Sequence, residues 1–259
     1  MTTSTPPEAT GTTQTPSPHS AWLRCLDTRP DAPTRLICFP HAGGSASVFR
    51  AWLSAWDAST ELWAVQYPGR EDRTTESMPG TLSDLARHIA LTLQWKSDKP
   101  FAFFGHSMGA VVAYETASQL SRLGLTTPSR LIASGSPPPG SAAEQAGQDD
   151  NAESVQWLHD GPPPDAELQR AAARVLAADL DLLARYPQRT PTPLDIPLTV
   201  LRNRDDPGLD AGALAPWDQY TTCGVDTVTL PGDHFACYEQ PHVILAELRK
   251  SSPAPRSAR

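Results

Sequence analysis

The residues with the clearest chemical potential in this sequence are a serine, an aspartate and a histidine, which follow one another in that order. Ser107 is the centre of a Gly-x-Ser-x-Gly pentapeptide, Asp206 lies in a turn, and His234 lies in a loop near the end of the chain. A serine hydroxyl is a poor nucleophile at neutral pH, so it needs an adjacent base, and the base needs a group that fixes its tautomer. We therefore expect acyl transfer to Ser107, with His234 as the base and Asp206 as the acid.

The acid is the member of this set that the sequence leaves open. Asp205 and Asp206 are neighbours in the same turn, and Pro207 biases the backbone of Asp206 towards an extended conformation. Asp233 is adjacent to His234, and adjacent residues rarely place a carboxylate against the imidazole. We favour Asp206 as the acid, and Asp205 stays the alternative.

Acyl transfer places negative charge on the carbonyl oxygen, and preformed donors must stabilise that charge. The backbone N–H of Met108, directly after Ser107, is one expected donor. The second should come from the glycine-containing loop His41–Gly44, which follows an early apolar strand. We assign this second donor to the N–H of Ala42.

The segment around Ser107 also predicts the local structure that such a nucleophile needs. An apolar strand that begins at Phe101 runs into the pentapeptide, and residues 110–124 carry apolar side chains at helical spacing. A sharp turn from strand to helix at a serine exposes its hydroxyl at the top of the sheet. Gly105 and Gly109 fit this turn because a Cβ at either position would collide with a neighbouring strand or helix.

Strand and helix patterns alternate along most of the chain, which favours a parallel sheet with crossover helices. The predicted strands as far as residue 135 are near-continuously apolar, as expected where helices cover both faces of a sheet, whereas the last predicted strand alternates apolar and polar residues. These strands lie at residues 22–26, 35–39, 61–67, from 101, 130–135, 196–201 and 225–230. The predicted helices lie at residues 46–56, 81–94, 110–124, 166–186, 213–220 and 241–249.

Residues 136–193 interrupt this alternation with proline-rich breakers and a long helical pattern at 166–186. We expect a helical lid at the catalytic end of the sheet, with ordinary packed scaffold as the alternative. The α/β domain should span 21–250. Segments 1–20 and 251–259 carry too few apolar side chains to offset the entropy of ordering, so we expect them to be disordered.

The overall composition excludes several classes of function. A chain of 259 residues with a net charge of −8 disfavours a nucleic-acid partner and binding to an anionic membrane. No apolar run reaches transmembrane length, and the N-terminus lacks the pattern of a secretory signal. The four cysteines form no CxxC pair and no metal-ligand cluster, which favours reduced thiols in a cytoplasmic protein without metal or cofactor. No exposed apolar stripe stands out, so we expect a monomer.

Other polar residues near these motifs have simpler interpretations. We expect His41 and His106 to pack within their loops. The charged run Arg70–Arg73 is expected to form a solvated loop. None of these residues is expected to act as the catalytic base.

Four motifs, in this order along the chain, resemble the type II thioesterases, which are free-standing α/β-hydrolases of polyketide and nonribosomal peptide biosynthesis. The motifs are Phe39–Ala46, Tyr67–Glu71, Gly105–Ala110 and Pro231–Phe235. The resemblance implies the α/β-hydrolase fold, a mostly parallel central sheet flanked by helices, with a helical lid insertion. It also implies Ser107 as the nucleophile, His234 as the base and Asp206 as the acid, with no cofactor.

The reaction that the resemblance implies is hydrolysis of acyl thioesters on the phosphopantetheine arm of carrier proteins. This reaction removes aberrant or stalled acyl groups from the carrier proteins, so that polyketide or nonribosomal peptide synthesis can resume. Acyl-loaded carrier proteins are then the expected partners, and they should dock on a local patch of apolar and basic residues. The turn at 202–204 departs from the family pattern, which often has glycine there. Three alternatives stay open: a carboxylesterase or lipase-like hydrolase, a non-enzymatic carrier-binding protein that keeps the fold, and transfer of the acyl group to a nucleophile other than water.

Overall fold

The computed structural model describes residues 21–148, 165–187, 190–206, 209 and 211–250. Within these residues, seven strands form one sheet in the order β1-β3-β2-β4-β5-β6-β7. The strands are β1 (Leu23–Asp27), β2 (Thr34–Phe39), β3 (Thr60–Val65), β4 (Phe101–His106), β5 (Leu131–Ser134), β6 (Leu198–Asn203) and β7 (Val225–Leu230). β1 pairs antiparallel with β3, and every other neighbouring pair is parallel. The tails expected to be disordered lie outside the described residues.

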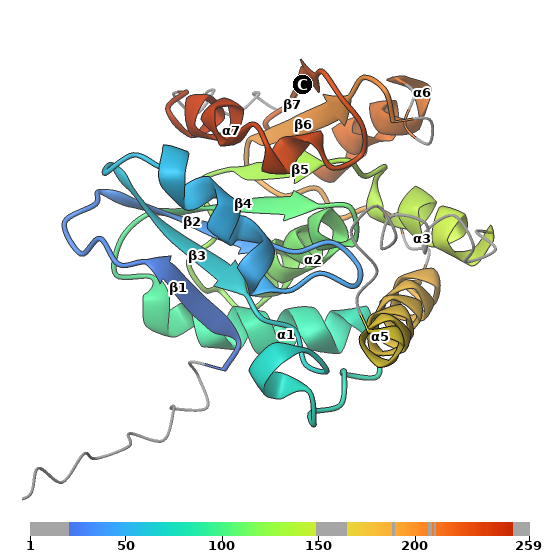
Figure 1. The fold of residues 1–259 in the computed structure, drawn as a ribbon. Coiled ribbons are helices and arrows are strands. Elements are labelled where there is room, and N and C mark those ends of the chain that lie inside the picture. The colour runs from blue at the N-terminus through green and yellow to red at the C-terminus, as the bar shows by residue number, and fades with distance from the viewer. Residues whose placement is uncertain (1–20, 149–164, 188–189, 207–208, 210, 251–259) are drawn as a thin grey trace, which may run out of the picture.

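Helices cover both faces of the sheet, which confirms the predicted fold class (Figure 1). α1 (Leu82–Leu93) and α2 (Met108–Arg122) pack on one face, and η2 (Ala46–Ala55) and α7 (Pro241–Leu248) pack on the other. Each face has its own apolar cluster, so the central strands are buried on both sides. The shorter elements are η3 (Glu71–Arg73), η4 (Gln94–Lys96), α6 (Ala211–Leu214), η5 (Ala215–Tyr220) and η6 (Ala236–Tyr238).

The helix predicted at 81–94 is confirmed as α1, and its start has a local cause. Thr81 Oγ1 accepts a hydrogen bond of 3.0 Å from the N–H of Asp84. This bond satisfies one of the amides that the first turn of a helix leaves without a partner. Leu85 and Ile89 follow at helical spacing and are fully buried against the sheet.

The helix predicted at 46–56 is present in the structure as a 3-10 helix, η2. A 3-10 helix has about three residues per turn, so Phe49 and Trp52 lie one above the other, and both are fully buried. The ring of Trp52 stacks on Trp56 with centroids 5.6 Å apart and meets Phe104 of β4 edge-on at 5.1 Å. This aromatic packing against the sheet favours the tighter winding.

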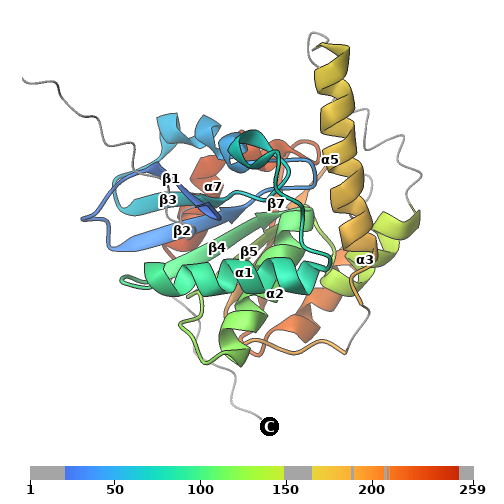
Figure 2. The same ribbon diagram turned by 90° about the horizontal axis from the view of Figure 1, so that it is seen from below.

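Two helices occupy the insertion between β5 and β6: α3 (Pro139–Gln148) and α5 (Ala166–Ala184). Figure 1 shows them together beyond the ends of the central strands, and Figure 2 shows one end of α5 extending past the rest of the fold. The buried residues of α5 lie in its second half, which includes Leu176 and Asp179, whereas Leu168 near its start is 61% exposed. No described helix is long and apolar enough to cross a membrane. The exact limits of the domain and of the insertion stay predictions.

The junction between β4 and α2 has the sharp turn that the sequence predicts. Ser107 connects the two elements with φ of 52° and ψ of −124°, a conformation that non-glycine residues rarely adopt. A Cβ at Gly105 would overlap the backbone of Gly109, and a Cβ at Gly109 would overlap the carbonyl oxygen of Phe39. The two glycines therefore allow α2 to lie directly against the ends of β4 and β2.

We expect the substitution Gly109→Ala to destabilise the fold strongly, because the new methyl group meets rigid backbone atoms of Phe39 and Pro40. Overpacking of this kind costs about 3 kcal/mol, and each kcal/mol lowers the Tm of a domain of this size by about 2–4 °C. Thermal unfolding followed by circular dichroism measures the effect. Gly80→Ala is the matched control, since a Cβ there meets nothing within 4 Å. Equal Tm values for the two variants would contradict the close approach between α2 and the end of β2.

Candidate active site

Ser107 lies at the carboxyl end of β4 and at the N-terminus of α2, where the structure leaves it half-buried. Its N–H donates to the carbonyl oxygen of Ser134 (2.8 Å), and its own carbonyl oxygen accepts from the N–H of Ala110 (2.9 Å). These two bonds fix the strained backbone of Ser107 between the sheet and the helix. The positive end of the dipole of α2 therefore points at the position of the serine.

His234 and Asp206 form a hydrogen-bonded pair, although they are placed by different loops. His234 lies in the loop after β7 and Asp206 in the loop after β6, and His234 Nδ1 is 2.6 Å from Asp206 Oδ2. The two side chains are only 13% and 6% exposed. A carboxylate can only accept a hydrogen bond, so Nδ1 is the donor in this pair. This tautomer leaves the lone pair on Nε2 of His234, which is the form that a general base needs.

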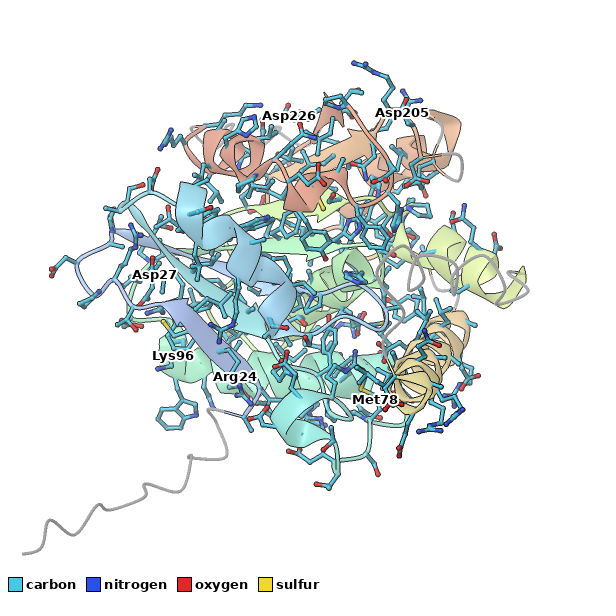
Figure 3. All side chains as sticks on the ribbon, in the orientation of Figure 1. Arg24, Asp27, Met78, Lys96, Asp205 and Asp226 are labelled. Atoms are coloured by element: carbon cyan, nitrogen blue, oxygen red, sulfur yellow. The ribbon has the colours of Figure 1, made fainter. Side chains whose placement is uncertain are left out.

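Asp205, the alternative acid, has a different environment in the structure. Its side chain is exposed at the edge of the molecule (Figure 3). Asp205 Oδ2 accepts from the N–H of Gly232 (3.1 Å), and the N–H of Asp205 donates to the carbonyl oxygen of Gly232 (3.0 Å). Asp205 therefore ties the loop that carries Asp206 to the loop that carries His234. The carboxylate that meets His234 is that of Asp206.

The two expected oxyanion donors lie on either side of a close backbone approach. Met108 begins α2, and Ala42 lies just beyond the end of β2, where Gly109 packs against the backbone of Phe39 and Pro40. Within the described part of the chain, neither the N–H of Ala42 nor that of Met108 donates a hydrogen bond to another residue. Both amides thus remain able to donate to a substrate oxygen.

Two further histidines surround His234, as expected for packing residues. The ring of His106 lies 4.7 Å from that of His234, and His41 Nδ1 is hydrogen-bonded to the hydroxyl of Tyr238 (2.6 Å). Burial, with smaller contributions from His234 and Arg70, lowers the pKa of His41 to about 4. Burial also lowers the pKa of His106 well below its usual value. Among the described residues, no group of three or more His, Cys, Asp and Glu side chains is placed to hold a metal ion.

The prediction of a solvated loop at 70–73 is wrong for its two arginines. Arg70 and Arg73 are only 7% and 3% exposed. Arg73 Nη1 donates to the carbonyl oxygen of Gln66 (2.6 Å), and its guanidinium lies 4.1 Å from the ring of Trp22. Arg70 pairs with a carboxylate from the insertion. Guanidinium groups are buried only where acceptors match their donors, and both arginines have such acceptors.

The partner of Arg70 is Asp179 of α5, a residue that sequence reasoning did not single out. Both oxygens of Asp179 accept from Arg70, each at 2.7 Å, and the side chain is fully buried. The sequence does contain a signal for it. Asp179 lies one helical turn after Leu176 and one turn before Leu182 and Leu183, on the stripe that the apolar pattern predicts to be buried. An aspartate on such a stripe indicates a buried partner.

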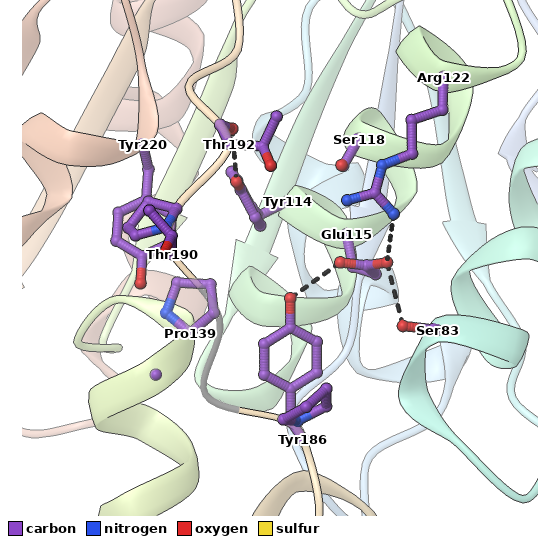
Figure 4. Close-up of a pocket in the computed structure, with 13 residues that line it drawn as sticks. Ser83, Tyr114, Glu115, Ser118, Arg122, Pro139, Tyr186, Thr190, Thr192 and Tyr220 are labelled. Atoms are coloured by element: carbon purple, nitrogen blue, oxygen red, sulfur yellow. Dashed lines mark hydrogen bonds and ion pairs between the residues drawn. The ribbon is translucent and has the colours of Figure 1, made fainter.

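A pocket beside α2 lies away from these groups (Figure 4). Neither Ser107 nor His234 is among the described residues that line it. Glu115 lies at its centre and accepts hydrogen bonds from Tyr186 Oη (2.8 Å) and Ser83 Oγ (3.1 Å). Burial and the adjacent carboxylate raise the pKa of Tyr186, so its hydroxyl stays a donor. Because Tyr186 follows α5 directly, this contact attaches the C-terminal end of α5 to α2.

Comparison with known proteins assigns these features to a family. A family model described as the thioesterase domain matches residues 34–251. The thioesterase PikA5 of Streptomyces venezuelae is 33% identical over 235 residues, which cover 88% of this chain and 84% of PikA5. The gramicidin S biosynthesis protein GrsT of Aneurinibacillus migulanus is 30% identical, with 86% of this chain and 91% of GrsT covered. The solved structure of the type II thioesterase BorB, from the borrelidin biosynthetic cluster, has a TM-score of 0.76 at 30% identity, covering 88% of this chain and 96% of BorB.

A mostly parallel sheet with a serine elbow and a histidine–aspartate pair defines a protein of the α/β-hydrolase type. The chain belongs to the thioesterase domain family. The resemblance to the type II thioesterases of polyketide and nonribosomal peptide biosynthesis is confirmed, and the enzyme class is that of a thioesterase.

The low pKa of His41 predicts a specific dependence of stability on pH. The folded protein keeps this imidazole neutral between its usual pKa of 6.5 and about 4, whereas the unfolded chain takes up a proton in that range. The free energy of unfolding should therefore fall as the pH drops from 6.5 to about 4, by up to about 1.4 kcal/mol per pH unit. In the variant His41→Gln this decline should be shallower. Denaturant unfolding at a series of pH values measures it.

The matched control for this experiment is Tyr238→Phe. It removes the hydrogen-bond partner of His41 Nδ1 but keeps the buried imidazole, so it should retain the steep decline. Parallel curves for wild type and His41→Gln would contradict the assignment of the proton uptake to His41.

Proposed function

We propose that the protein hydrolyses acyl thioesters on the phosphopantetheine arm of carrier proteins through an acyl-serine intermediate. In this proposal Ser107 is the nucleophile, His234 the general base and Asp206 the acid that orients it. The observation that carries the proposal is the 2.6 Å contact between His234 Nδ1 and Asp206 Oδ2, at the end of the sheet where Ser107 is held in its strained conformation. This arrangement supports nucleophilic catalysis by serine more directly than any other group of described side chains.

The first step forms the acyl-enzyme. Ser107 Oγ attacks the thioester carbonyl carbon while His234 Nε2 takes the hydroxyl proton, and Asp206 stabilises the imidazolium that results. The carbonyl oxygen becomes an oxyanion, which the N–H groups of Ala42 and Met108 stabilise. Collapse of the tetrahedral intermediate breaks the C–S bond, and the departing pantetheine thiolate takes the proton from His234 Nε2, which leaves the imidazole neutral for the second step. Because a thiol has a pKa of about 8.5, this leaving group needs little help from a general acid.

The second step returns the enzyme to its starting state. A water molecule attacks the acyl-serine carbonyl while His234 takes one of its protons, and the resulting intermediate again places its oxyanion at Ala42 and Met108. The C–O bond to Ser107 then breaks, and His234 returns the proton to Ser107 Oγ. The product is a free carboxylic acid. The insertion that contains α5 is proposed to act as the lid that limits access of water and admits the arm.

The choice of carrier-bound substrates rests on resemblance. PikA5 is named as a thioesterase, GrsT as a gramicidin S biosynthesis protein, and BorB comes from the borrelidin biosynthetic cluster. Acyl-loaded carrier proteins of such a pathway are the proposed partners. The protein itself is proposed to be a monomer. The proposed location is the cytoplasm, since the four cysteines are free thiols, as a reducing compartment favours.

The decisive experiment compares wild type with Ser107→Ala on an acyl-phosphopantetheinyl carrier protein, followed by intact mass. Loss of the nucleophile should reduce kcat by about 10⁶-fold, so the acyl group should stay on the carrier. Ser121→Ala is the control, because Ser121 is exposed on the same helix. Hydrolysis by the alanine variant at a rate near that of wild type would refute the role of Ser107.

The same assay separates the remaining alternatives. Faster turnover of an oxygen ester than of the matched thioester would favour a carboxylesterase or lipase-like enzyme. Appearance of an ester or amide product in place of the free acid would favour transfer to another nucleophile.

The choice of acid is tested by comparing Asp206→Asn with Asp205→Asn. Asparagine at 206 can donate to Nδ1 of His234 and thereby favour the wrong tautomer, so we expect kcat to fall by about 10⁴-fold. Asparagine at 205 keeps an oxygen that can accept from the N–H of Gly232, so activity should stay within about threefold of wild type. Steady-state hydrolysis of a small thioester measures both. A larger loss at position 205 would reverse the assignment.

A further inference from the structure

The loop that carries the proposed oxyanion donor Ala42 is held by two side chains from distant parts of the sequence. Gly43 has φ of +78°, and its N–H donates to Asp179 Oδ2 (2.7 Å). The carbonyl oxygen of Gly44 accepts from Arg70 Nη1 (2.8 Å). Polar backbone groups of both residues that follow Ala42 are therefore fixed from outside the loop.

Arg70 and Asp179 also hold each other. Arg70 donates through Nη1 and Nη2 to both carboxylate oxygens of Asp179, each at 2.7 Å, and the two side chains are 7% and 0% exposed. Asp179 Oδ2 thus accepts from both Arg70 and the N–H of Gly43. Such a buried network is stable only when every member has its partner. Loss of one charge would therefore disturb the loop as well as the ion pair.

An apolar contact supports the same interface. A Cβ built on Gly43 would lie 3.3 Å from the Cβ of Leu176, so the loop packs directly against α5. Leu176 precedes Asp179 by one helical turn, which places both side chains on one face of α5. The second half of α5 therefore covers the loop with one apolar and one charged residue, while its first half is largely exposed.

We propose that Asp179 and Arg70 are positioning residues that keep the oxyanion loop in its catalytic shape while α5 is seated on it. The inference rests on the proposed function, because it takes the N–H of Ala42 as an oxyanion donor. Displacement of α5 removes the acceptor of the Gly43 N–H and the partner of Arg70 in one movement. Asp179 thus affects the chemical step through the loop and through Arg70.

The first test is Asp179→Asn. The amide oxygen can still accept one hydrogen bond, but the charge that holds Arg70 is gone. We expect kcat for a small thioester to fall by about 10²-fold with KM changed by less than about threefold, because an oxyanion donor is misplaced while ground-state binding is kept. Asp181→Asn is the matched control: Asp181 lies on the same helix, is 65% exposed and pairs with Arg185 at 2.7 Å. It should behave as wild type.

A second measurement distinguishes positioning from general stability. A trifluoromethyl ketone forms a tetrahedral adduct with Ser107, and the oxyanion of that adduct needs the N–H of Ala42. Its affinity should fall in Asp179→Asn by the same factor as kcat. Hydrogen exchange of the Gly43 amide, which donates to Asp179, should accelerate in this variant and not in Asp181→Asn. A purely structural role would lower the Tm without this selective pattern.

The variant Arg70→Lys provides the second test, in case Asp179→Asn does not fold. Lysine keeps the charge, but a single ammonium group cannot reproduce the fork that meets both oxygens of Asp179 and the carbonyl oxygen of Gly44. We expect the same selective loss of kcat. Wild-type kcat and analogue affinity in either folded variant would overturn the proposal, and so would failure of both variants to fold.

Failure of the proposed function has a different signature. In that case wild type would neither hydrolyse thioesters nor bind the trifluoromethyl ketone. The exchange rate of the Gly43 amide would still report whether Asp179 holds the loop. Unchanged exchange in Asp179→Asn would then overturn the positioning role on its own.

Discussion

The arrangement of the site depends on the contact between Gly109 and the backbone at the end of β2. A Cβ at Gly109 would overlap the carbonyl oxygens of Phe39 and Pro40, so only glycine permits α2 to lie this close. Pro40 is followed directly by the loop that carries Ala42, and Gly109 is preceded directly by Met108. One close approach therefore sets the distance between the two proposed oxyanion donors and, through the start of α2, the position of Ser107.

Much of this fold could be predicted because its signals are local. The alternation of apolar strands with amphipathic helices predicts the parallel sheet, and the pentapeptide around Ser107 predicts the turn from β4 into α2. The type of η2 could not be predicted in the same way. Its winding brings Trp52 against Phe104 of β4, a contact between segments far apart in the sequence. Sequence periodicity does not report such contacts.

The candidate site likewise contains residues that local sequence signals predict and residues that depend on distant contacts. Chain order predicts Ser107 and His234 as partners. Both residues follow predicted strands, and in α/β-hydrolases the nucleophile, the acid and the histidine follow one another in this order. The choice between Asp205 and Asp206 depends on which carboxylate faces the imidazole, and only the turn after β6 decides that. The pair of Arg70 and Asp179 was missed because its members are 109 residues apart and charged residues are ordinarily exposed.

The surroundings of His234 favour the charge separation that acyl transfer requires. Burial lowers the pKa of His41 and of His106 and raises that of Tyr238 well above its usual value, so these neighbours stay neutral at pH 7. Arg70 is held in a buried ion pair with Asp179. A proton taken from Ser107 therefore creates a positive charge on His234 that meets no cationic neighbour among these groups, while Asp206 lies beside Nδ1. Low polarity around an ion pair strengthens its attraction. The burial that keeps His41 and His106 neutral therefore also stabilises the imidazolium–carboxylate pair of His234 and Asp206.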